Sequence, residues 1–202
     1  MTNASNLMRM NKTGVISRIK DFLRPYNVYI PGRATIPSWQ QSFRVLERYQ
    51  FRPNTVFDIG VAYGTYDLYR AFPDAHYHLI DPTRESLHYM RLLEQQLRCT
   101  VHHMALGDHD GSVDIEIRPD IQGATLLEDV SEREILRHDH VPMRRFDSLI
   151  GEIDRPSLCK IDVQGAELMV LQGMTGRLDC IDALIVATST IASLKGGPEV
   201  HD

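Results

Sequence analysis

The chain has 202 residues, of which 43% are hydrophobic and 24% are charged, and its formal net charge is −5. This length accommodates one well-buried domain and is short for two, and the composition is that of an ordinary globular protein. The negative charge excludes a general attraction to nucleic acid or to anionic membranes, so small molecules or a protein carrier are the expected partners.

Three cysteines, Cys99, Cys159 and Cys180, form no C-x-x-C pair, so the sequence indicates neither a disulfide framework nor a zinc site. The first residues lack the apolar core of a signal peptide. No stretch approaches the roughly 18 to 20 apolar residues of a membrane span. These features predict a cytoplasmic protein without a membrane span.

Two helical patterns precede the first strand. Apolar residues recur at helical spacing within residues 15–23 and again within residues 39–49. Prolines and a glycine between residues 25 and 37 mark a loop. Residues 1–53 are therefore predicted to form a helical extension, which serves either as a substrate lid or mainly as a packing element.

The stretch TVFDIGVAYGT at residues 55–65 joins a buried-strand pattern to a glycine loop. Gly60 and Gly64 allow the backbone to turn sharply and to approach a ligand closely. Residues 66–72 then favour a helix, which Pro73 ends. A strand, a glycine turn and a helix in this order place backbone N–H groups at the carboxyl end of a sheet, where open α/β folds bind their ligands.

The spacing of this loop distinguishes between cofactors. A dinucleotide fingerprint requires G-x-G-x-x-G, whereas this loop has Gly60, Ala62 and Gly64 followed by Thr65. The Asp58 carboxylate beside the loop suits a cationic ligand better than a pyrophosphate. S-adenosylmethionine carries an ammonium, a sulfonium and a ribose diol but no phosphate. The loop therefore favours S-adenosylmethionine over NAD.

A second acidic residue follows at the next strand end. Residues 77–80 are typical of a strand, and Asp81 ends it about 20 residues after the loop, where such folds place the carboxylate that accepts hydrogen bonds from ribose hydroxyls. Pro82 is expected as the first residue of a helix whose apolar residues continue to Leu97.

A third parallel strand is predicted at residues 100–104. Residues 105–108 turn out of it toward the same sheet edge, where we expect the backbone or Leu106 to contact an adenine. Residues 112–117 and 141–146 alternate as two half-exposed strands that pair as an accessory ribbon. Between them lie a small-residue loop at 122–126 and a charged, helical stretch at 128–138.

The last elements surround a cluster of charged residues. A helical turn is predicted at 147–150, a strand at 158–163, a helix from about 168 to 174, and a final strand at 181–186. Little ordered structure is expected beyond residue 192. The cluster at the end of the 158–163 strand consists of Lys160, Asp162 and Glu167. It predicts either a catalytic group or an internal ion pair that fastens the strand to its helix.

With these pieces in order, the chain resembles the FkbM family of S-adenosylmethionine-dependent methyltransferases. The resemblance covers residues 54–190 and rests on VFDIGVAYGTY, LIDPTRESLHYM, MALGDHDG, RRFDSLI and, most specifically, CKIDVQGAELMVLQGM. It implies an α/β fold, namely a Rossmann-like class I methyltransferase three-layer sandwich with a mostly parallel sheet. Residues 191–202 would be a disordered tail.

The resemblance also implies roles for individual residues. Asp162 would face the transferred methyl group and, with Glu167, is a candidate base, while Lys160 tunes both carboxylates. The His102 and His103 side chains are weaker candidates, because neighbouring strand residues point to opposite faces. The residues implied to line the cofactor site are Asp58, Gly60, Ala62, Gly64 and Asp81, with Ala105 and Leu106 beside the adenine.

The sequence departs from the family pattern at several positions. Ala62 replaces the loop asparagine, Gln164 replaces a glutamate and so cannot act as a base, and Ala187 stands where a glutamate is common. The chain also stops where the family continues through a further helix and two strands. The C-terminal strands are therefore expected to be missing, and a homo-oligomer is one way to cover the exposed edge of the last strand.

Three functional classes follow. The first is a methyltransferase acting on a hydroxyl of a sugar, lipid or secondary-metabolite scaffold. The second is a non-catalytic methyltransferase-fold protein that acts as a binding or assembly partner, and the third is an NAD-type oxidoreductase, which the loop spacing disfavours. No metal site is predicted, because the remaining histidines form no compact ligand pattern with carboxylates.

Overall fold

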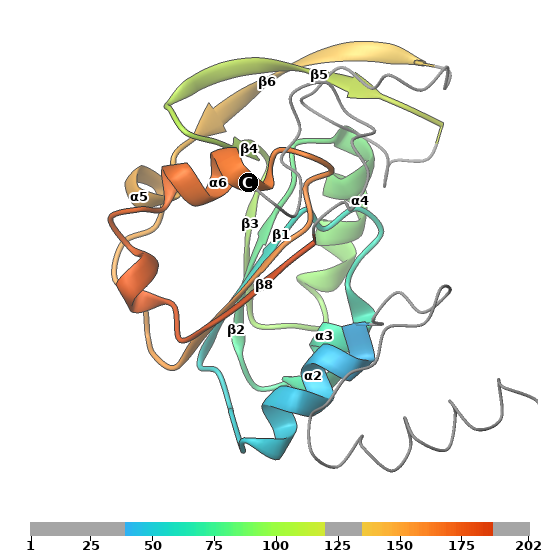
Figure 1. Cartoon of the computed structure of the whole chain (residues 1–202). Coiled ribbons are helices and arrows are strands. Elements are labelled where there is room, and N and C mark those ends of the chain that lie inside the picture. Colours follow the sequence, from blue (N-terminus) through green and yellow to red (C-terminus); the bar gives the residue numbers. More distant parts are fainter. Residues whose placement is uncertain (1–38, 120–134, 188–202) are drawn as a thin grey trace, which may run out of the picture. The chain divides into compact units, whose positions relative to one another are not determined.

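The computed structural model describes residues 39–119 and 135–187 (Figure 1). Contacts between Cα atoms divide the chain into two units, Met1–Tyr49 and Gln50–Asp202. In the first unit the described element is helix α2, Trp39–Arg48, which matches the helical pattern predicted there. None of the helices formed by the described residues is long and apolar enough to cross a membrane.

The second unit is built on a sheet of five parallel strands in the order β3-β2-β1-β7-β8. All five residues of β1 and of β7 are buried, including the charged Asp58 and Lys160, so these two strands lie at the centre of the sheet's interior. The strands are β1 (Thr55–Ile59), β2 (His76–Ile80), β3 (Cys99–His102), β7 (Ser157–Ile161) and β8 (Ala183–Val186).

Helices cover both faces of this sheet (Figure 1). Helices α3 (Tyr66–Ala71) and α4 (Arg84–Leu93) lie on one face, and α5 (Phe146–Leu149) and α6 (Glu167–Gly173) lie on the other. The short 3-10 helix η3 (Leu178–Cys180) precedes β8. The predicted three-layer α/β sandwich with a parallel sheet is thus confirmed.

Helix α4 begins later than the sequence pattern suggested. Thr83 is its N-cap, and the Thr83 hydroxyl accepts a hydrogen bond of 3.1 Å from the Ser86 N–H. Pro82 therefore lies before the cap and not at the first helical position. The helix also ends at Leu93, so that Leu97 lies outside it.

A second sheet of three strands contains β4 (Ala105–Leu106), β5 (Gly111–Ile117) and β6 (Arg137–Arg144) in the order β4-β6-β5. Strands β5 and β6 form the predicted antiparallel ribbon. The predicted helix at 128–138 is wrong at all of its described residues, 135–138. Arg137 and His138 belong to β6, where exposed positions alternate with buried ones such as Asp139. Figure 1 shows the ribbon across the end of the sheet that carries the start of α4.

The core lies mainly between the sheet and the helices α5 and α6. It contains Phe57 and Ile161 from the central strands, Phe146 from α5 and Val170 from α6. A smaller apolar cluster lines the inner side of the ribbon, including Ile115 and Met143. The predictions for residues 1–38, 122–126, 128–134 and 191–202 lie outside the described residues.

Candidate cofactor site

The glycine loop between β1 and α3 lies against the ends of two neighbouring strands. Three of its residues have positive φ angles: Gly60 at 82°, Ala62 at 47° and Gly64 at 109°. The Gly60 N–H donates to the Ile80 carbonyl at 2.9 Å, and a Cβ on Gly60 would lie 1.9 Å from the Asp162 carbonyl oxygen. Only glycine fits at position 60, and its absence of a side chain brings the loop next to both β2 and β7.

Asp81, at the end of β2, contacts this loop directly. Its Oδ2 accepts a hydrogen bond of 2.9 Å from the Ala62 N–H, and its Oδ1 accepts from the Thr83 N–H and hydroxyl at 2.9 and 2.8 Å. These bonds hold the carboxylate rigidly between the loop and the start of α4. Because a carboxylate oxygen has two lone pairs, Oδ2 retains one acceptor position for a ligand hydroxyl.

Asp58 has a different environment from the one expected of a cofactor ligand. Its side chain is fully buried in β1, and its carboxylate accepts hydrogen bonds from the Tyr69 hydroxyl at 2.6 Å and the Thr65 hydroxyl at 3.2 Å. The Lys160 Nζ lies 3.0 Å from its Oδ1. Three protein donors thus surround the Asp58 carboxylate, an arrangement that does not favour the predicted direct contact with a cationic ligand.

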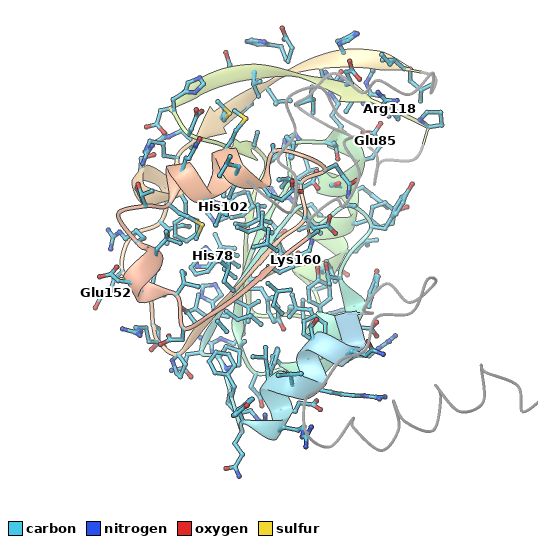
Figure 2. All side chains as sticks on the ribbon, viewed as in Figure 1. His78, Glu85, His102, Arg118, Glu152 and Lys160 are labelled. Atoms are coloured by element: carbon cyan, nitrogen blue, oxygen red, sulfur yellow. The ribbon has the colours of Figure 1, made fainter. Side chains whose placement is uncertain are left out.

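Lys160 also lies elsewhere than the sequence suggested. Its register partner across the β1–β7 pair is Asp58, and its Nζ donates to the Gly60 carbonyl at 2.5 Å. Figure 2 shows Lys160 in the middle of the sheet, away from the ribbon end marked by Arg118 and Glu85. Lys160 thus forms an internal ion pair with Asp58 of β1, which is a different pair from the predicted one that would fasten the strand to its helix. The tuning of Asp162 and Glu167 by Lys160 stays a prediction.

Glu167, the first residue of α6, folds back on the turn before it. Its Oε1 accepts from the Val163 N–H at 3.0 Å and its Oε2 from the Gly165 N–H at 2.9 Å. The side chain is buried, and each of its two oxygens already holds a backbone donor. This geometry stabilises the turn and the helix N-terminus. It does not favour the predicted role of Glu167 as a base.

Asp162 follows β7 directly and remains the candidate base. Its backbone N–H donates to the Ile59 carbonyl at 3.0 Å, which fixes it beside the glycine loop. Its half-buried carboxylate accepts a hydrogen bond of 2.9 Å on Oδ1 from the Gln164 amide, whose residue has a φ of 55°. Among the described residues no donor contacts Oδ2.

Ala105 and Leu106 belong to the core instead of an open edge. Both are buried because they form β4, which pairs in parallel with Met143 and Arg144 of β6. Leu106 packs in the main core with Phe57 and Phe146. The expected contact of the Leu106 side chain with an adenine is not supported, because β4 pairing turns this side chain inward.

His102, the last residue of β3, and His103, which follows it, have different surroundings. His102 stacks on His78, with 3.0 Å between His78 Nδ1 and His102 Nε2, on the sheet face that carries Phe57. It thus points into the layer below α5 and α6 (Figure 2). His103 has a buried Nε2 without a hydrogen-bond partner among the described residues.

Sequence reasoning missed the hydroxyl groups that support the predicted carboxylates. Thr65 and Tyr69 bind Asp58, and Thr83 binds Asp81. A signal was present, because Thr65 and Tyr69 stand four residues apart at the start of α3 and so lie on the same helix face. In the described ranges, no group of three His, Cys, Asp or Glu side chains is arranged to hold a metal ion.

Comparisons with known proteins show the family to which the chain is related. The family model described as the methyltransferase FkbM domain matches residues 58–194, which is more than half of the chain. A comparison with curated proteins found no match. A crystal structure of methyltransferase FkbM from Methylobacillus flagellatus KT is similar, with 20% sequence identity and a TM-score of 0.48. The similarity covers 67% of this chain and 32% of that chain, so the matched part is about a third of the solved protein.

The family match contains the glycine loop, Asp81 and the turn from β7 into α6. The structure brings these segments together at the carboxyl ends of the parallel strands. The chain therefore belongs to the methyltransferase FkbM domain family.

Proposed function

We propose that the chain is an S-adenosylmethionine-dependent methyltransferase that methylates a hydroxyl oxygen on a sugar, lipid or secondary-metabolite scaffold. The observation that carries the proposal is the contact of Asp81 with the glycine loop. The Asp81 carboxylate accepts the Ala62 N–H at 2.9 Å, and Gly60 of the same loop touches the Asp162 backbone. The proposed ribose-binding carboxylate, Asp81, and the proposed base, Asp162, thus lie on either side of the same loop.

The residues at this edge fit an adenosyl methyl donor. Asp81 Oδ2 keeps an acceptor position for a ribose hydroxyl. The loop has small residues at Gly60, Ala62 and Gly64, and Gly60 lets the loop approach the Asp162 backbone closely. The spacing of the loop departs from the dinucleotide fingerprint, which argues against NAD. Asp81, Gly60, Ala62 and Gly64 would hold the donor.

The chemistry requires little beyond positioning and one proton acceptor. When bound, S-adenosylmethionine supplies an electrophilic methyl group on its sulfonium. The chain's own contribution is to hold the acceptor hydroxyl in line with that methyl group and to remove its proton. The Asp162 carboxylate, oriented by the Gln164 amide, is placed to accept the proton on Oδ2. Glu167 supports this by fixing the turn that carries both residues.

Calorimetric titration with S-adenosylmethionine, S-adenosylhomocysteine and NAD tests the proposal. We expect binding of the two adenosyl compounds and no binding of NAD. Binding of NAD alone would replace the proposal with an oxidoreductase. Binding of S-adenosylhomocysteine without turnover on any hydroxyl acceptor would instead favour a non-catalytic binding or assembly protein, for which the Gln164 replacement is the supporting observation.

The Asp81→Ala variant tests the site more sharply. We expect it to lose about 1 to 3 kcal/mol of S-adenosylhomocysteine affinity, which is the range for a hydrogen bond to a charged group. Asp74→Ala is the matched control, because Asp74 is an exposed acid that precedes β2. An unchanged dissociation constant for Asp81→Ala would remove Asp81 from the site.

Partners and location are part of the same proposal. The acceptor is a small-molecule or glycan hydroxyl, and the net charge of −5 argues against nucleic acid. A homo-oligomer that covers β8 remains a proposal. The three cysteines are free, which supports a reducing compartment such as the cytoplasm.

A further inference from the structure

A buried ion pair lies directly beneath the glycine loop. Lys160 Nζ and Asp58 Oδ1 are 3.0 Å apart, and their side chains are 2% and 0% exposed. The two residues face each other across the parallel β1–β7 pair. Removing two charges from water is costly, so a pair at this depth requires further hydrogen bonds to satisfy its remaining polar atoms.

Those hydrogen bonds come from both ends of the glycine loop. At its start, Lys160 Nζ donates to the Gly60 carbonyl at 2.5 Å and lies 3.4 Å from the Ile59 carbonyl. At its end, the Thr65 hydroxyl donates to Asp58 Oδ1 at 3.2 Å. The ion pair therefore ties the first and last residues of the loop to the same point in the sheet.

Tyr69 completes this network from α3. Its hydroxyl donates to Asp58 Oδ2 at 2.6 Å. Burial, followed by the nearby Asp58 charge, raises the pKa of Tyr69 well above its usual range, so the hydroxyl stays protonated and remains a donor. The start of α3, and with it the loop that leads into it, is thereby fixed to β1.

The backbone of the loop needs such support. Ala62 has a φ of 47°, a left-handed conformation that an alanine rarely adopts and that is costly for residues with a Cβ. Conformations of this kind persist only where the surrounding structure determines them. The Ala62 N–H is the donor that contacts Asp81, so the strained residue is also the one that joins the loop to the proposed ribose carboxylate.

We propose that Lys160 and Asp58 are positioning residues that set the conformation of the glycine loop for binding of the adenosyl cofactor, and that neither touches the cofactor. The inference rests on the proposed function for the identity of the ligand. It assigns the buried pair a role in affinity, beyond holding β1 against β7. A pair that only joins the two strands would affect stability without any separate effect on binding.

A double-mutant cycle separates these two roles. Lys160→Met and Asp58→Asn each leave one buried charge without its partner, so each single variant is expected to lower the melting temperature. The double variant removes both charges and should recover most of the stability. Its S-adenosylhomocysteine dissociation constant should nevertheless stay about tenfold weaker than that of the wild type, because the Gly60 carbonyl still lacks its charged donor.

The outcomes of the cycle are distinct. Recovery of both stability and affinity in the double variant would overturn the proposal and leave a purely structural pair. If the single variants do not fold, Tyr69→Phe provides a milder test, since it removes one donor and no charge. The control is Arg70→Met, whose guanidinium makes an exposed pair with Asp67 on the same helix, and which should bind like the wild type.

Hydrogen exchange gives a readout that does not depend on the cofactor. In the unliganded double variant, amides of residues 60–65 should exchange faster than in the wild type, whereas those of α5 should be unchanged. Unchanged exchange in the loop would contradict the positioning role. Failure of the wild type to bind any adenosyl compound, together with faster loop exchange in the variant, would reject the proposed function but retain the role of the pair in shaping the loop.

Discussion

Asp162 differs from the two other charged residues of the predicted cluster in its hydrogen bonding. The sequence proposes three charged residues, but Lys160 is paired with Asp58 and Glu167 holds two backbone N–H groups. Asp162 alone of the three is half-buried with an oxygen open to a ligand. The Gln164 amide donates to the other oxygen, Oδ1, and so orients the carboxylate without occupying Oδ2.

The Asp162→Asn variant tests this assignment. An asparagine keeps the size of the side chain but accepts a proton poorly, so we expect turnover to fall by about 10²-fold or more, within the usual contribution of a general base. Binding of S-adenosylhomocysteine should stay nearly unchanged. Steady-state kinetics with calorimetry on the same preparation provide the measurement, and an unaffected turnover number would show that Asp162 is not the base.

The left-handed backbone conformation of Ala62 can be tested by substitution. A glycine at this position would relieve the cost of a left-handed alanine, and we expect Ala62→Gly to stabilise the protein by about 1 kcal/mol. The control is Ala71→Gly at the end of α3, which should destabilise by about 0.5 to 1 kcal/mol because that residue is helical. Urea denaturation measures both. A destabilising effect of Ala62→Gly would mean that the loop gains nothing from a left-handed glycine.

At the level of elements, the sequence predicted best where one physical signal dominates. In each of β1, β2 and β7 three of the five residues are apolar and buried, and this pattern located the strands to within a few residues. Ala105 and Leu106 were read as a turn because a two-residue strand has no period of its own and exists only by pairing with β6. Arg137 and His138 looked helical because charged residues dominate their neighbourhood.

In the candidate site, too, some features could be predicted from the sequence and others could not. The sequence located the carboxylates Asp81 and Asp162 because each directly follows a strand, and Asp58 because it lies two residues before Gly60 of the glycine loop. It did not locate their partners, since these depend on strand register: Asp58 meets Lys160 only because β1 and β7 pair with these residues opposite each other. Whether a carboxylate forms a buried ion pair or faces a ligand depends on the direction of its side chain. The spacing of residues along the sequence does not give that direction.

Strands β2 and β3 carry a histidine cluster that makes their stability depend on pH. His78 lies between His76 and His102 and stacks on Phe57. Burial, followed by the charges of the two neighbouring histidines, lowers the pKa of His78 from 6.5 to about 4. The pKa of His102 is also lowered by burial. The folded state therefore takes up these protons at lower pH than the unfolded chain does.

The sign of the effect follows from this difference. Above pH 6.5 both states are neutral at His78, whereas between pH 6.5 and 4 only the unfolded state binds the proton, so stability falls as the pH falls. One histidine contributes at most about 1.4 kcal/mol per pH unit, and less because His78 is partly exposed. Urea denaturation from pH 7 to 4.5 should show this loss in the wild type and a smaller loss in His78→Phe. The control, His138→Phe at an exposed position, should follow the wild type; equal slopes in all three proteins would contradict the prediction.

Ligand binding at the carboxyl ends of the strands is expected to change the stability of the whole folded unit. Both proposed ligand contacts, Asp81 and the glycine loop, belong to the ends of buried strands, so they exist only when the parallel sheet is formed. A ligand that binds this edge must therefore bind the native state and not the unfolded chain. Its free energy of binding then appears as stability of the entire unit.

This linkage predicts the size of the effect. S-adenosylhomocysteine at about 100 times its dissociation constant should raise the free energy of unfolding by about 2.7 kcal/mol, with a corresponding rise in melting temperature, while NAD at the same concentration should cause none. The Asp81→Ala variant should require a higher ligand concentration for the same shift, in proportion to its weaker affinity. Thermal unfolding across a ligand series measures this directly. If calorimetry shows that the protein binds S-adenosylhomocysteine while the melting temperature stays unchanged, the ligand also binds the unfolded chain. Its site is then not at the carboxyl ends of the folded strands.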